Sequence, residues 1–372
     1  MKIKFYLLIS FFLFLISCRS NSKQEKDQNE TCSFYVGTYT NEDSEGIYKY
    51  SLDKEGKIKQ IGLSAKSKNP SFLAWSTDHK FLVAVNETDN EGFGTVGSFE
   101  VTDSVLKFIN RQPTGGAHPC HVAVNEKGYV LVTNYSGGNV GLLKLDDSGK
   151  LTELLDVQQH SGNGLTDRQE APHAHSVWFV GDDNVISVDL GTNELWFSQL
   201  DTDRKKLLPS NPQKLKMEPG AGPRHLALHP NGKWFYVVNE LDCTVTRILK
   251  KGNGFYEKRE SVSTLPTNFT EANYCADIHI SSDGKFVYAS NRGHNSIAIF
   301  RVNSNDGTLE AIAHQDVKGE WPRSFALSPD ENLLVVANQY TNNIVSFKRD
   351  KNTGLLELVD DIDAPSPVCI LF

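Results

Sequence analysis

The chain has 372 residues, of which 39% are hydrophobic and 23% are charged, and its formal net charge is −8. This acidic balance argues against a broad nucleic-acid-binding surface, because such a surface needs clustered lysine and arginine. We therefore expect no nucleic acid among the partners. The length would suit two ordinary domains, but β-barrels and propellers of this size also form one unit.

The first predicted element is an export signal. Residues 1–17, MKIKFYLLISFFLFLIS, carry Lys2 and Lys4, then an apolar run, then a small Ser17 before Cys18. This order is typical of a secretory signal, and the run is too short to indicate a membrane span. The letters LISC before a polar stretch are typical of a bacterial lipoprotein, so we predict that Cys18 is lipidated. An ordinary signal peptide with an incidental cysteine is the alternative.

The predicted anchor sets the domain organisation and the location. Residues 18–32 would be the lipidated cysteine and a flexible polar tether, and residues 33–372 would be the folded domain. We expect an exported lipoprotein, attached to a membrane through its lipid on the periplasmic side or in the cell envelope.

A repeat of about fifty residues runs through the predicted folded domain. Its common element is an apolar strand that ends in Asn or Asp, at Asn86, Asn134, Asp189, Asn239, Asn291 and Asn338. Another strand and a turn of Asn, Asp, Gly or Pro precede most of these strands, which predicts a β-hairpin in each repeat. A third apolar strand and weaker outer material follow most hairpins.

The two ends of the chain supply one more repeat. FYVGTYT, residues 34–40, matches the second strand of a hairpin, and SPVCILF, residues 366–372, matches the first strand. Pairing of these two segments predicts an all-β fold, a seven-bladed β-propeller closed by its N- and C-terminal strands. An open stack of sheets is the alternative, but it would leave the terminal strands unpaired.

Polar residues recur where the hairpin strands meet at one end. The start of the first strand and the end of the second lie together because the two strands are antiparallel. First strands begin with His118, His121, His173, His175, Arg224, His225 and Arg323, and second strands are followed by or end in Glu87, Tyr135, Glu240, Arg292 and Gln339. We expect these side chains around one mouth of a central channel. His173 and His175 are two residues apart, so they would share one face of a strand.

Structural roles compete with a functional one for several of these residues. The recurrent Asn and Asp residues would mostly bond loop backbone. His121, His175 and His225 would occupy matching repeat positions and could bond between blades, and Arg224 with Glu240 could be a structural ion pair. A metal site is the other reading of the histidines, but the nearby arginines favour a carboxylate or phosphate ligand over a cation. We expect no metal.

Cysteine spacing gives no sign of a metal cluster. Cys32, Cys120, Cys243, Cys275 and Cys369 are widely separated and contain no CxxC pair. Buried single thiols fit this spacing best, and a disulfide is permitted in an exported protein but not indicated.

Several motifs in combination resemble one known family. They include YVGTYT, RQEAPHAHSV, PGAGPRHLALHPNGKWFYVVNEL, YASNRGHNSIAIF and VVANQYTNNIVSFKRD. These stretches resemble the bacterial seven-bladed 6-phosphogluconolactonases, which are related to the fungal carboxy-muconate lactonising enzymes. The resemblance runs from about residue 34 to residue 372.

The resemblance implies a lactone hydrolase without metal or cofactor. It implies hydrolysis of a small anionic sugar-acid lactone, such as 6-phosphoglucono-1,5-lactone to 6-phosphogluconate. The site residues that it implies are His175, Arg224, Glu240 and Arg292, with His173 as an alternative base. Around them we expect substrate-binding residues, namely His118, His121, His173, Arg323, Tyr135 and Gln339.

Two other functions remain open on the sequence. One is a lactonising cycloisomerase that uses the same residues, and the other is a non-catalytic propeller that binds a ligand or a protein. The predicted export signal departs from the family pattern, because 6-phosphogluconolactone is a cytoplasmic intermediate. We expect a monomer.

Overall fold

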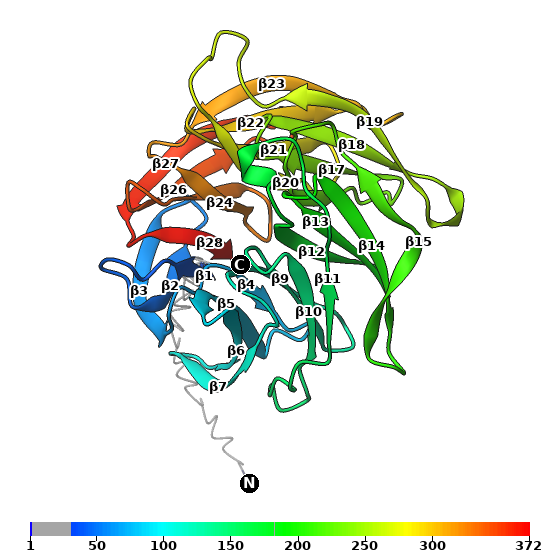
Figure 1. The fold of residues 1–372 in the computed structure, drawn as a ribbon. Coiled ribbons are helices and arrows are strands. Elements are labelled where there is room, and N and C mark those ends of the chain that lie inside the picture. The colour runs from blue at the N-terminus through cyan, green and yellow to red at the C-terminus, as the bar shows by residue number, and fades with distance from the viewer. Residues whose placement is uncertain (2–30, 182) are drawn as a thin grey trace.

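The structure is a computed structural model that describes residue 1, residues 31–181 and residues 183–372. The predicted signal, Cys18 and nearly all of the predicted tether lie outside these residues. Seven four-stranded antiparallel sheets form a ring of blades (Figure 1). The seven-bladed propeller predicted from the repeat is therefore confirmed.

The strands of each blade follow one another outward from the channel. The first strands are β28 (Pro367–Leu371), β4 (Leu73–Trp75), β8 (Pro119–Val124), β12 (Ala174–Val180), β16 (Pro223–Leu228), β20 (Tyr274–Ile280) and β24 (Pro322–Leu327). The second strands are β1 (Cys32–Thr38), β5 (Phe81–Asn90), β9 (Tyr129–Asn134), β13 (Asn184–Asp189), β17 (Trp234–Asn239), β21 (Phe286–Arg292) and β25 (Leu333–Asn338). Each first strand lies against the first strands of both neighbouring blades, so the seven form the inner ring.

The outer half of each blade is built in the same way. The third strands are β2 (Gly46–Leu52), β6 (Phe93–Val101), β10 (Asn139–Lys144), β14 (Glu194–Asp201), β18 (Thr244–Lys250), β22 (Ser296–Val302) and β26 (Asn343–Arg349). The outermost strands are β3 (Ile58–Lys66), β7 (Leu106–Pro113), β11 (Asp156–Gln159), β15 (Lys206–Lys216), β19 (Tyr256–Ser263), β23 (Leu309–Asp316) and β27 (Leu356–Asp363). Two short 3-10 helices, η1 (Asp167–Gln169) and η2 (Gly252–Gly254), lie in connections.

The two termini close the ring within one sheet. β28 pairs with β1, and Ile370 lies opposite Val36. In Figure 1 the red β28 lies beside the blue β1 and β2. The predicted closure is confirmed, and it leaves neither terminal strand without a partner.

Hydrophobic contacts between blades form the core. Among the described residues, seven buried clusters each join a pair of adjacent blades. Every residue of β9, β17 and β25 is buried, because a neighbouring sheet covers each face of these strands. This explains why the second strands contain continuous apolar runs rather than an alternating pattern. In outermost strands such as β7 and β27, buried or half-buried residues are interspersed with exposed ones.

The recurrent Asn residues mostly bond backbone, as predicted. The side-chain amides of Asn134, Asn291 and Asn338 donate to carbonyls of Thr114, Thr264 and Val317 at 3.0, 2.9 and 3.0 Å. These bonds tie each second strand to the connection that enters its blade.

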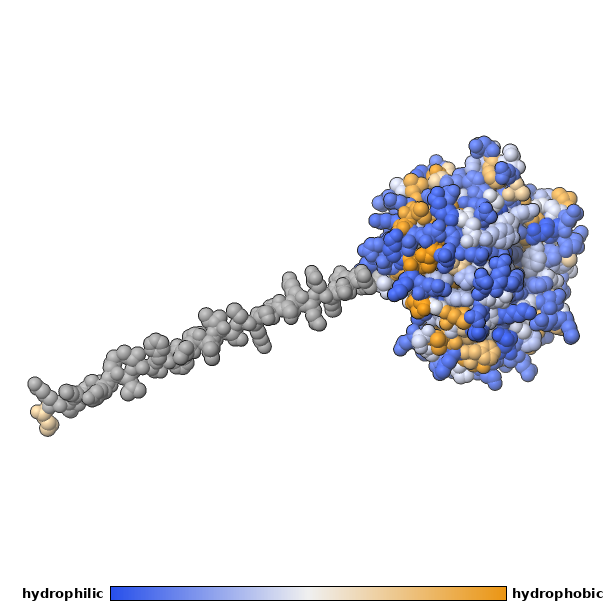
Figure 2. Space-filling view, turned by 90° about the vertical axis from the view of Figure 1, so that its left-hand side faces the viewer, coloured by the Kyte–Doolittle hydropathy of each residue, from blue (hydrophilic) through white to orange (hydrophobic). Residues whose placement is uncertain are grey.

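The outer surface carries both polar and apolar residues. Figure 2 shows one side of the propeller, where hydrophilic side chains surround separate apolar areas. Within the described part of the chain, no helix has the length and hydropathy to cross a membrane.

Candidate active site

A β-bulge at the start of the first strand places the key side chains. In four blades the pairing of the first with the second strand skips one residue, namely Cys120, His175, Arg224 and Arg323. A bulge re-aims a side chain and is frequent beside active sites. Each first strand here is in the inner ring, so the skipped residues lie at the channel.

This register corrects one expectation from the sequence. His121, His175 and His225 do not occupy matching positions. His121 and His225 follow the skipped residue and pair with Thr133 and Val238, whereas His175 is itself the skipped residue. A bulge shifts the alternation by one residue, and the sequence repeat alone does not reveal it.

Glu240 is the centre of an arginine cluster. Its Oε2 accepts from Nε of Arg224 at 3.1 Å and lies 2.9 Å from NH2 of Arg292. Its Oε1 accepts from NH2 of Arg168 at 3.1 Å. The structure thus brings together three residues that the sequence nominated and adds Arg168.

Backbone contacts hold two of these arginines in place. Arg224 donates to the carbonyl of Ala276 in the next blade. Arg292 donates from Nε to the carbonyl of Tyr274 at 3.2 Å and from NH2 to that of Cys275 at 2.9 Å. Both guanidinium groups are buried, so their positions are fixed before any ligand arrives.

The cluster keeps Glu240 ionised. Burial alone would raise the pKa of this carboxyl, but the charges of Arg292, Arg224 and Arg168 lower it to about 2. Burial, and then the neighbouring Arg292, lower the pKa of Arg224 to about 10. Near neutral pH Arg224 is therefore positively charged and Glu240 negatively charged.

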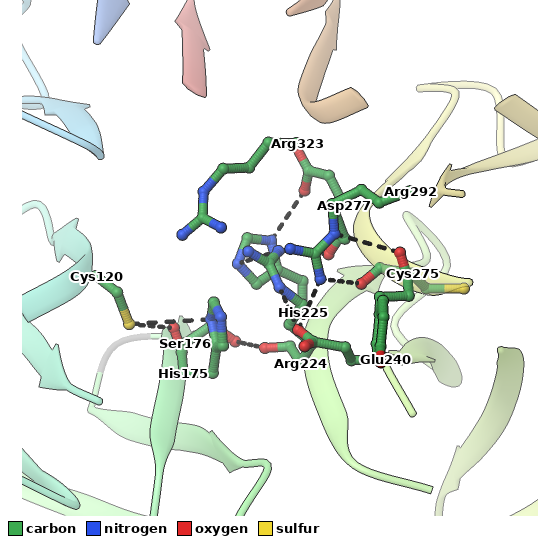
Figure 3. Close-up of polar contacts among 12 residues, drawn as sticks. Cys120, His175, Ser176, Arg224, His225, Glu240, Cys275, Asp277, Arg292 and Arg323 are labelled. Carbon is green, nitrogen blue, oxygen red and sulfur yellow. Dashed lines mark hydrogen bonds and ion pairs between the residues drawn. The ribbon is translucent and has the colours of Figure 1, made fainter. Parts of the chain in front are cut away.

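Arg323 is the least engaged cation of the site. Its nearest carboxylate among the described residues is Glu87, with NH2 at 4.0 Å from Oε2, and its guanidinium lies 5.3 Å from the ring centre of Tyr39. The hydroxyl of Tyr39 donates to the same Glu87 oxygen at 2.9 Å. Figure 3 shows Arg323 reaching toward the space between His175 and the other arginines.

Arginines gather at the centre of the mouth although the chain is acidic. Arg168, Arg224 and Arg292 share the single carboxylate of Glu240, and Arg323 lies 4.0 Å from that of Glu87. Burial raises the pKa of the Cys120 thiol to about 12, so it adds no negative charge. This arrangement suits an anionic ligand or a developing oxyanion.

His175 is a buried neutral imidazole beside this charge. It is 5% exposed, its Nδ1 lies 3.9 Å from Sγ of Cys120, and its ring centre lies 5.4 Å from that of His225. Burial, followed by the charge of Arg224, holds the pKa of His175 well below its usual value. Its Nε2 has no hydrogen-bond partner among the described residues and is accessible to solvent. It can therefore accept a proton.

His173 does not form a pair with His175. β12 begins at Ala174, so His173 precedes the strand, and the two histidines do not share a strand face as we expected. The ring of His173 stacks on Tyr135 at 4.4 Å between centres. Its Nδ1 lies 3.1 Å from the carbonyl oxygen of Tyr135 and its Nε2 lies 3.1 Å from Oε1 of Glu170. Both ring nitrogens are engaged, which favours His175 as the base.

The remaining nominated residues lie at different depths. His121 is buried, its ring is 5.5 Å from that of His225, and its Nε2 has no partner in the described chain. His118 is half-buried, and its Nδ1 lies 2.8 Å from Oγ of Ser136. Gln339 has a buried Oε1 without a partner in the described chain. Tyr135 receives a hydrogen bond at 3.1 Å from Arg168.

His225 belongs to a deeper polar pair. Its Nδ1 lies 2.9 Å from Oδ1 of Asp277, and Asp277 also contacts Nε2 of His279 at 3.3 Å. Burial, followed by the charge of Arg224, lowers the pKa of His225 to about 4. His225 is therefore neutral near pH 7 and supports Arg224, whose NH1 is 3.3 Å from His225 Nε2.

Two residues of the site were missed from the sequence. Arg168 lies on η1, in the connection between β11 and β12, and so outside the repeat frame. It is part of the RQEAPHAHSV motif, which was the available signal. Asp277 begins the apolar part of β20, where the register skips two residues, and a lone Asp in CADIHI gave only a weak signal.

A Ser-His-Asp arrangement formed by two residues of β13 and a histidine after β11 is not accessible. His160 Nδ1 lies 2.7 Å from Oδ2 of Asp189, and its Nε2 lies 3.3 Å from Oγ of Ser187. Ser187 and Asp189 are 0% exposed and His160 is 2% exposed. A substrate carbonyl cannot reach this serine, so we assign the three residues a structural role.

The described side chains include no group of three His, Cys, Asp or Glu residues that converges on a possible metal position. The five described cysteines are free thiols, and all but Cys32 are buried, which confirms the expectation of buried single thiols for four of them.

Comparison with known proteins matches the whole folded part of the chain. A family model described as "Lactonase, 7-bladed beta-propeller" covers residues 33–372. A protein of Bacillus subtilis named 6-phosphogluconolactonase is 37% identical over 343 residues, which cover 91% of this chain and 97% of that protein. A protein of the same name from Formosa agariphila is 33% identical and covers 82% of this chain and 89% of its own length.

Solved structures with a similar fold also match nearly the whole chain. A crystal structure of a protein from Lactobacillus plantarum has a TM-score of 0.87 at 33% identity and covers 92% of this chain and 99% of its own. The structure titled as a periplasmic gluconolactonase of Pseudomonas aeruginosa has a TM-score of 0.87 at 29% identity and covers 91% and 98% of the two chains.

Proposed function

We propose, because the chain belongs to the seven-bladed β-propeller lactonase family, that it hydrolyses the lactone of a sugar acid. The substrate would be an aldonolactone such as 6-phosphoglucono-1,5-lactone or its unphosphorylated form, and the product the open-chain aldonate. One observation carries the proposal: a neutral histidine with a free nitrogen lies beside a fixed group of arginines at the channel mouth.

The arginines would bind and polarise the lactone. Arg323 has a guanidinium with no hydrogen bond to the described residues, so it is the best candidate to bind a phosphate or carboxylate group of the substrate. Arg224 and Arg292 are fixed by Glu240 and by backbone carbonyls. Their remaining N–H groups would stabilise the oxyanion that forms at the lactone carbonyl, which is worth about 10²–10³ in rate.

His175 would then act as the general base. Its Nε2 would take a proton from a water molecule while the water oxygen attacks the lactone carbonyl carbon. When the tetrahedral intermediate collapses, the bond from that carbon to the ring oxygen breaks, and His175 would return the proton to the ring oxygen. The product would be a carboxylic acid, which loses its proton to solvent near neutral pH, and a free hydroxyl group.

Glu240 would position the arginines rather than carry protons. A carboxyl whose pKa is lowered to about 2 stays ionised at every pH at which the enzyme would work. Three arginines share its two oxygens, so its loss would free their side chains and leave their charges without a buried counter-ion.

The substrate class rests on the names of relatives and on the site charge. The Bacillus subtilis relative is named for a phosphorylated lactone and the Pseudomonas aeruginosa structure for an unphosphorylated one in the periplasm. The predicted export of this chain favours the unphosphorylated class, whereas the surplus arginine at the mouth favours an anionic group.

A lactone panel with a His175→Gln variant tests the proposal. The protein from residue 19 onward is assayed with phosphorylated and unphosphorylated sugar lactones, and ring opening is followed by the acid released. We expect turnover by the parent, and in His175→Gln a kcat lower by about 10²–10⁴ with KM little changed, because the proton acceptor is lost but a polar side chain stays.

His173→Gln is the matched control and should keep most of the parent's kcat. Wild-type kcat in a well-folded His175→Gln protein would remove His175 as the base. Cyclisation of an unsaturated acid without lactone hydrolysis would indicate a cycloisomerase, and ligand binding without any turnover would indicate a binding propeller.

A further inference from the structure

Three aromatic side chains gather on the rim of the channel mouth. Tyr274 begins β20, Trp321 directly precedes β24, and Tyr340 lies two residues after the end of β25. The rings of Trp321 and Tyr340 are stacked, with centres 4.7 Å apart and planes at 17°, and Tyr274 lies 6.1 Å from Trp321. Tyr340 is 58% exposed. We call these three residues the aromatic rim.

The aromatic rim begins where the arginine cluster ends. The guanidinium carbon of Arg292 lies 5.1 Å from the ring centre of Trp321, and Nε of Arg292 donates to the carbonyl of Tyr274. The same Arg292 pairs with Glu240. A ligand whose reacting group sits among the arginines would therefore pass this rim on its way to solvent.

Trp321 has a backbone conformation that disfavours a bulky residue. Its φ is +66°, in the left-handed region, and it precedes a proline, which restricts its backbone further. The corresponding residue before the first strand is Gly222 before β16, with φ +63°, Ser366 before β28, with φ +40°, and His118 before β8, with φ +52°. Glycine and serine serve the fold at two of these positions, and the larger His118 and Trp321 both lie at the channel mouth, so the fold itself does not require a tryptophan here.

The surroundings of the rim suit a neutral polar ligand. Glu320, next to Trp321, is exposed, and its carboxylate can accept hydrogen bonds from hydroxyl groups while it repels a second anion. Thr341 follows Tyr340 and is also exposed. A sugar ring matches this combination, because its C–H face packs on an aromatic ring while its hydroxyl groups bond polar neighbours and water.

We propose that the aromatic rim is a subsite for a second sugar ring, so that the site accepts glycosylated aldonolactones, such as the lactone of a disaccharide aldonic acid. The inference rests on the proposed lactonase function. The lactone ring lies among His175 and the arginines, and the glycosyl group projects past Arg292 onto the exposed face of Tyr340, which Trp321 holds in place.

The test compares ligands with one and two sugar rings. Hydrolysis is measured with glucono-1,5-lactone and cellobiono-1,5-lactone, and binding of gluconate and cellobionate is measured by calorimetry. We expect the parent to have a KM and a Kd about tenfold lower for the two-ring ligand of each pair. Tyr340→Ala should remove this difference and leave values for the one-ring ligands within about twofold, whereas Tyr340→Phe should keep it. Trp321→Gly should also remove the difference between one-ring and two-ring ligands.

Two control variants separate the subsite from general effects. Phe255→Ala removes an aromatic ring that is 48% exposed at the turn between β18 and β19, and Ser366→Gly relaxes the same backbone position in another blade. Both should behave as the parent. Equal KM values for the two lactones in the parent, or equal losses for both in the rim variants, would overturn the proposal.

The binding measurements with gluconate and cellobionate test the subsite independently of the lactonase function. If no lactone is turned over but cellobionate binds more tightly than gluconate in a Tyr340-dependent way, the hydrolase function fails and the subsite stands. If the lactones are hydrolysed without any preference for two rings, the hydrolase function stands and the subsite fails.

Discussion

At His175, burial and positive charge act in the same direction. Both favour the neutral imidazole, because a protonated ring would have to exist without water and beside Arg224. A neutral ring is ready to accept a proton, but its conjugate acid is unstable, so the base is weak in the empty site. An anionic substrate would offset the arginine charge and strengthen the base when it is needed.

The effect of substrate charge on the pKa of His175 predicts how activity falls at acid pH. Protonation of His175 would abolish activity, so kcat/KM should fall as pH drops through the pKa of the free enzyme, which lies below the ordinary value of about 6.5. For an anionic lactone, the limb in kcat should lie at higher pH than the limb in kcat/KM, because the bound anion raises the pKa. For neutral glucono-1,5-lactone the two limbs should nearly coincide. Steady-state rates from pH 4 to 8 check this, and a free-enzyme limb above 6.5 would contradict it.

Arg323 predicts selectivity between charged and neutral lactones. Arg323→Ala should weaken binding of a phosphorylated lactone by about 1.5–3 kcal/mol, the usual value of a charge-assisted hydrogen bond, and should change KM for the neutral lactone much less. Arg323→Lys should rescue only in part, because an ammonium group lacks the planar fork. Arg301, an exposed arginine paired with Glu310, is the control. Equal losses for both lactones in Arg323→Ala would argue against an anion-binding role.

At the residue scale, the sequence predicted side chains whose position follows from the repeat. Arg224, Glu240 and Arg292 each lie at a strand end, and antiparallel pairing brings such ends together. Arg168 was missed because it lies on η1, in a connection that the repeat does not describe. His173 was misplaced because β12 starts one residue later than the two-residue spacing implied.

At the element scale, hairpins were predictable and bulges were not. Apolar runs of strand length with turns between them recur in every repeat, so the hairpins followed from the pattern. A bulge needs one extra residue in one strand, and nothing in a stretch such as GPRHL marks which residue that is. The bulge nevertheless decides that Arg224 and His175, rather than their neighbours, are the skipped residues.

The closing strand β28 gives a prediction about stability. Its backbone bonds β1, its residues Val368, Cys369 and Ile370 are buried, and the last ring, Phe372, lies 5.1 Å from Phe34. Deletion of residues 366–372 would expose both the backbone of β1 and an inter-blade core. We expect insoluble protein or a melting temperature lower by more than 10 °C, measured by calorimetry. Deletion of residues 19–30 is the control, and a truncated protein that melts like the parent would contradict the role of β28.

At the scale of the whole molecule, different residues stabilise the ring of blades and form the candidate site. The hydrophobic clusters lie between blades, whereas the charged side chains of the site come from the inner strands and the loops at one mouth. The repeat made the blades predictable because each must bury apolar surface on both faces. The site was only partly predictable because it combines residues from several blades that differ from one another.

The location of the whole molecule is the last prediction. The LISC sequence and the polar residues after it predict that Cys18 carries a lipid, although this residue lies outside the described part of the chain. Cys18→Ala should block lipid attachment, so the protein should either move from the membrane to the soluble fraction or accumulate with its signal uncleaved. Fractionation with immunoblotting, together with the mass of the N-terminal peptide, measures both results. Cys32→Ala changes the next cysteine along the chain and should leave the protein membrane-bound. A Cys18→Ala protein that is processed normally and stays in the membrane would show that something other than this cysteine anchors the chain.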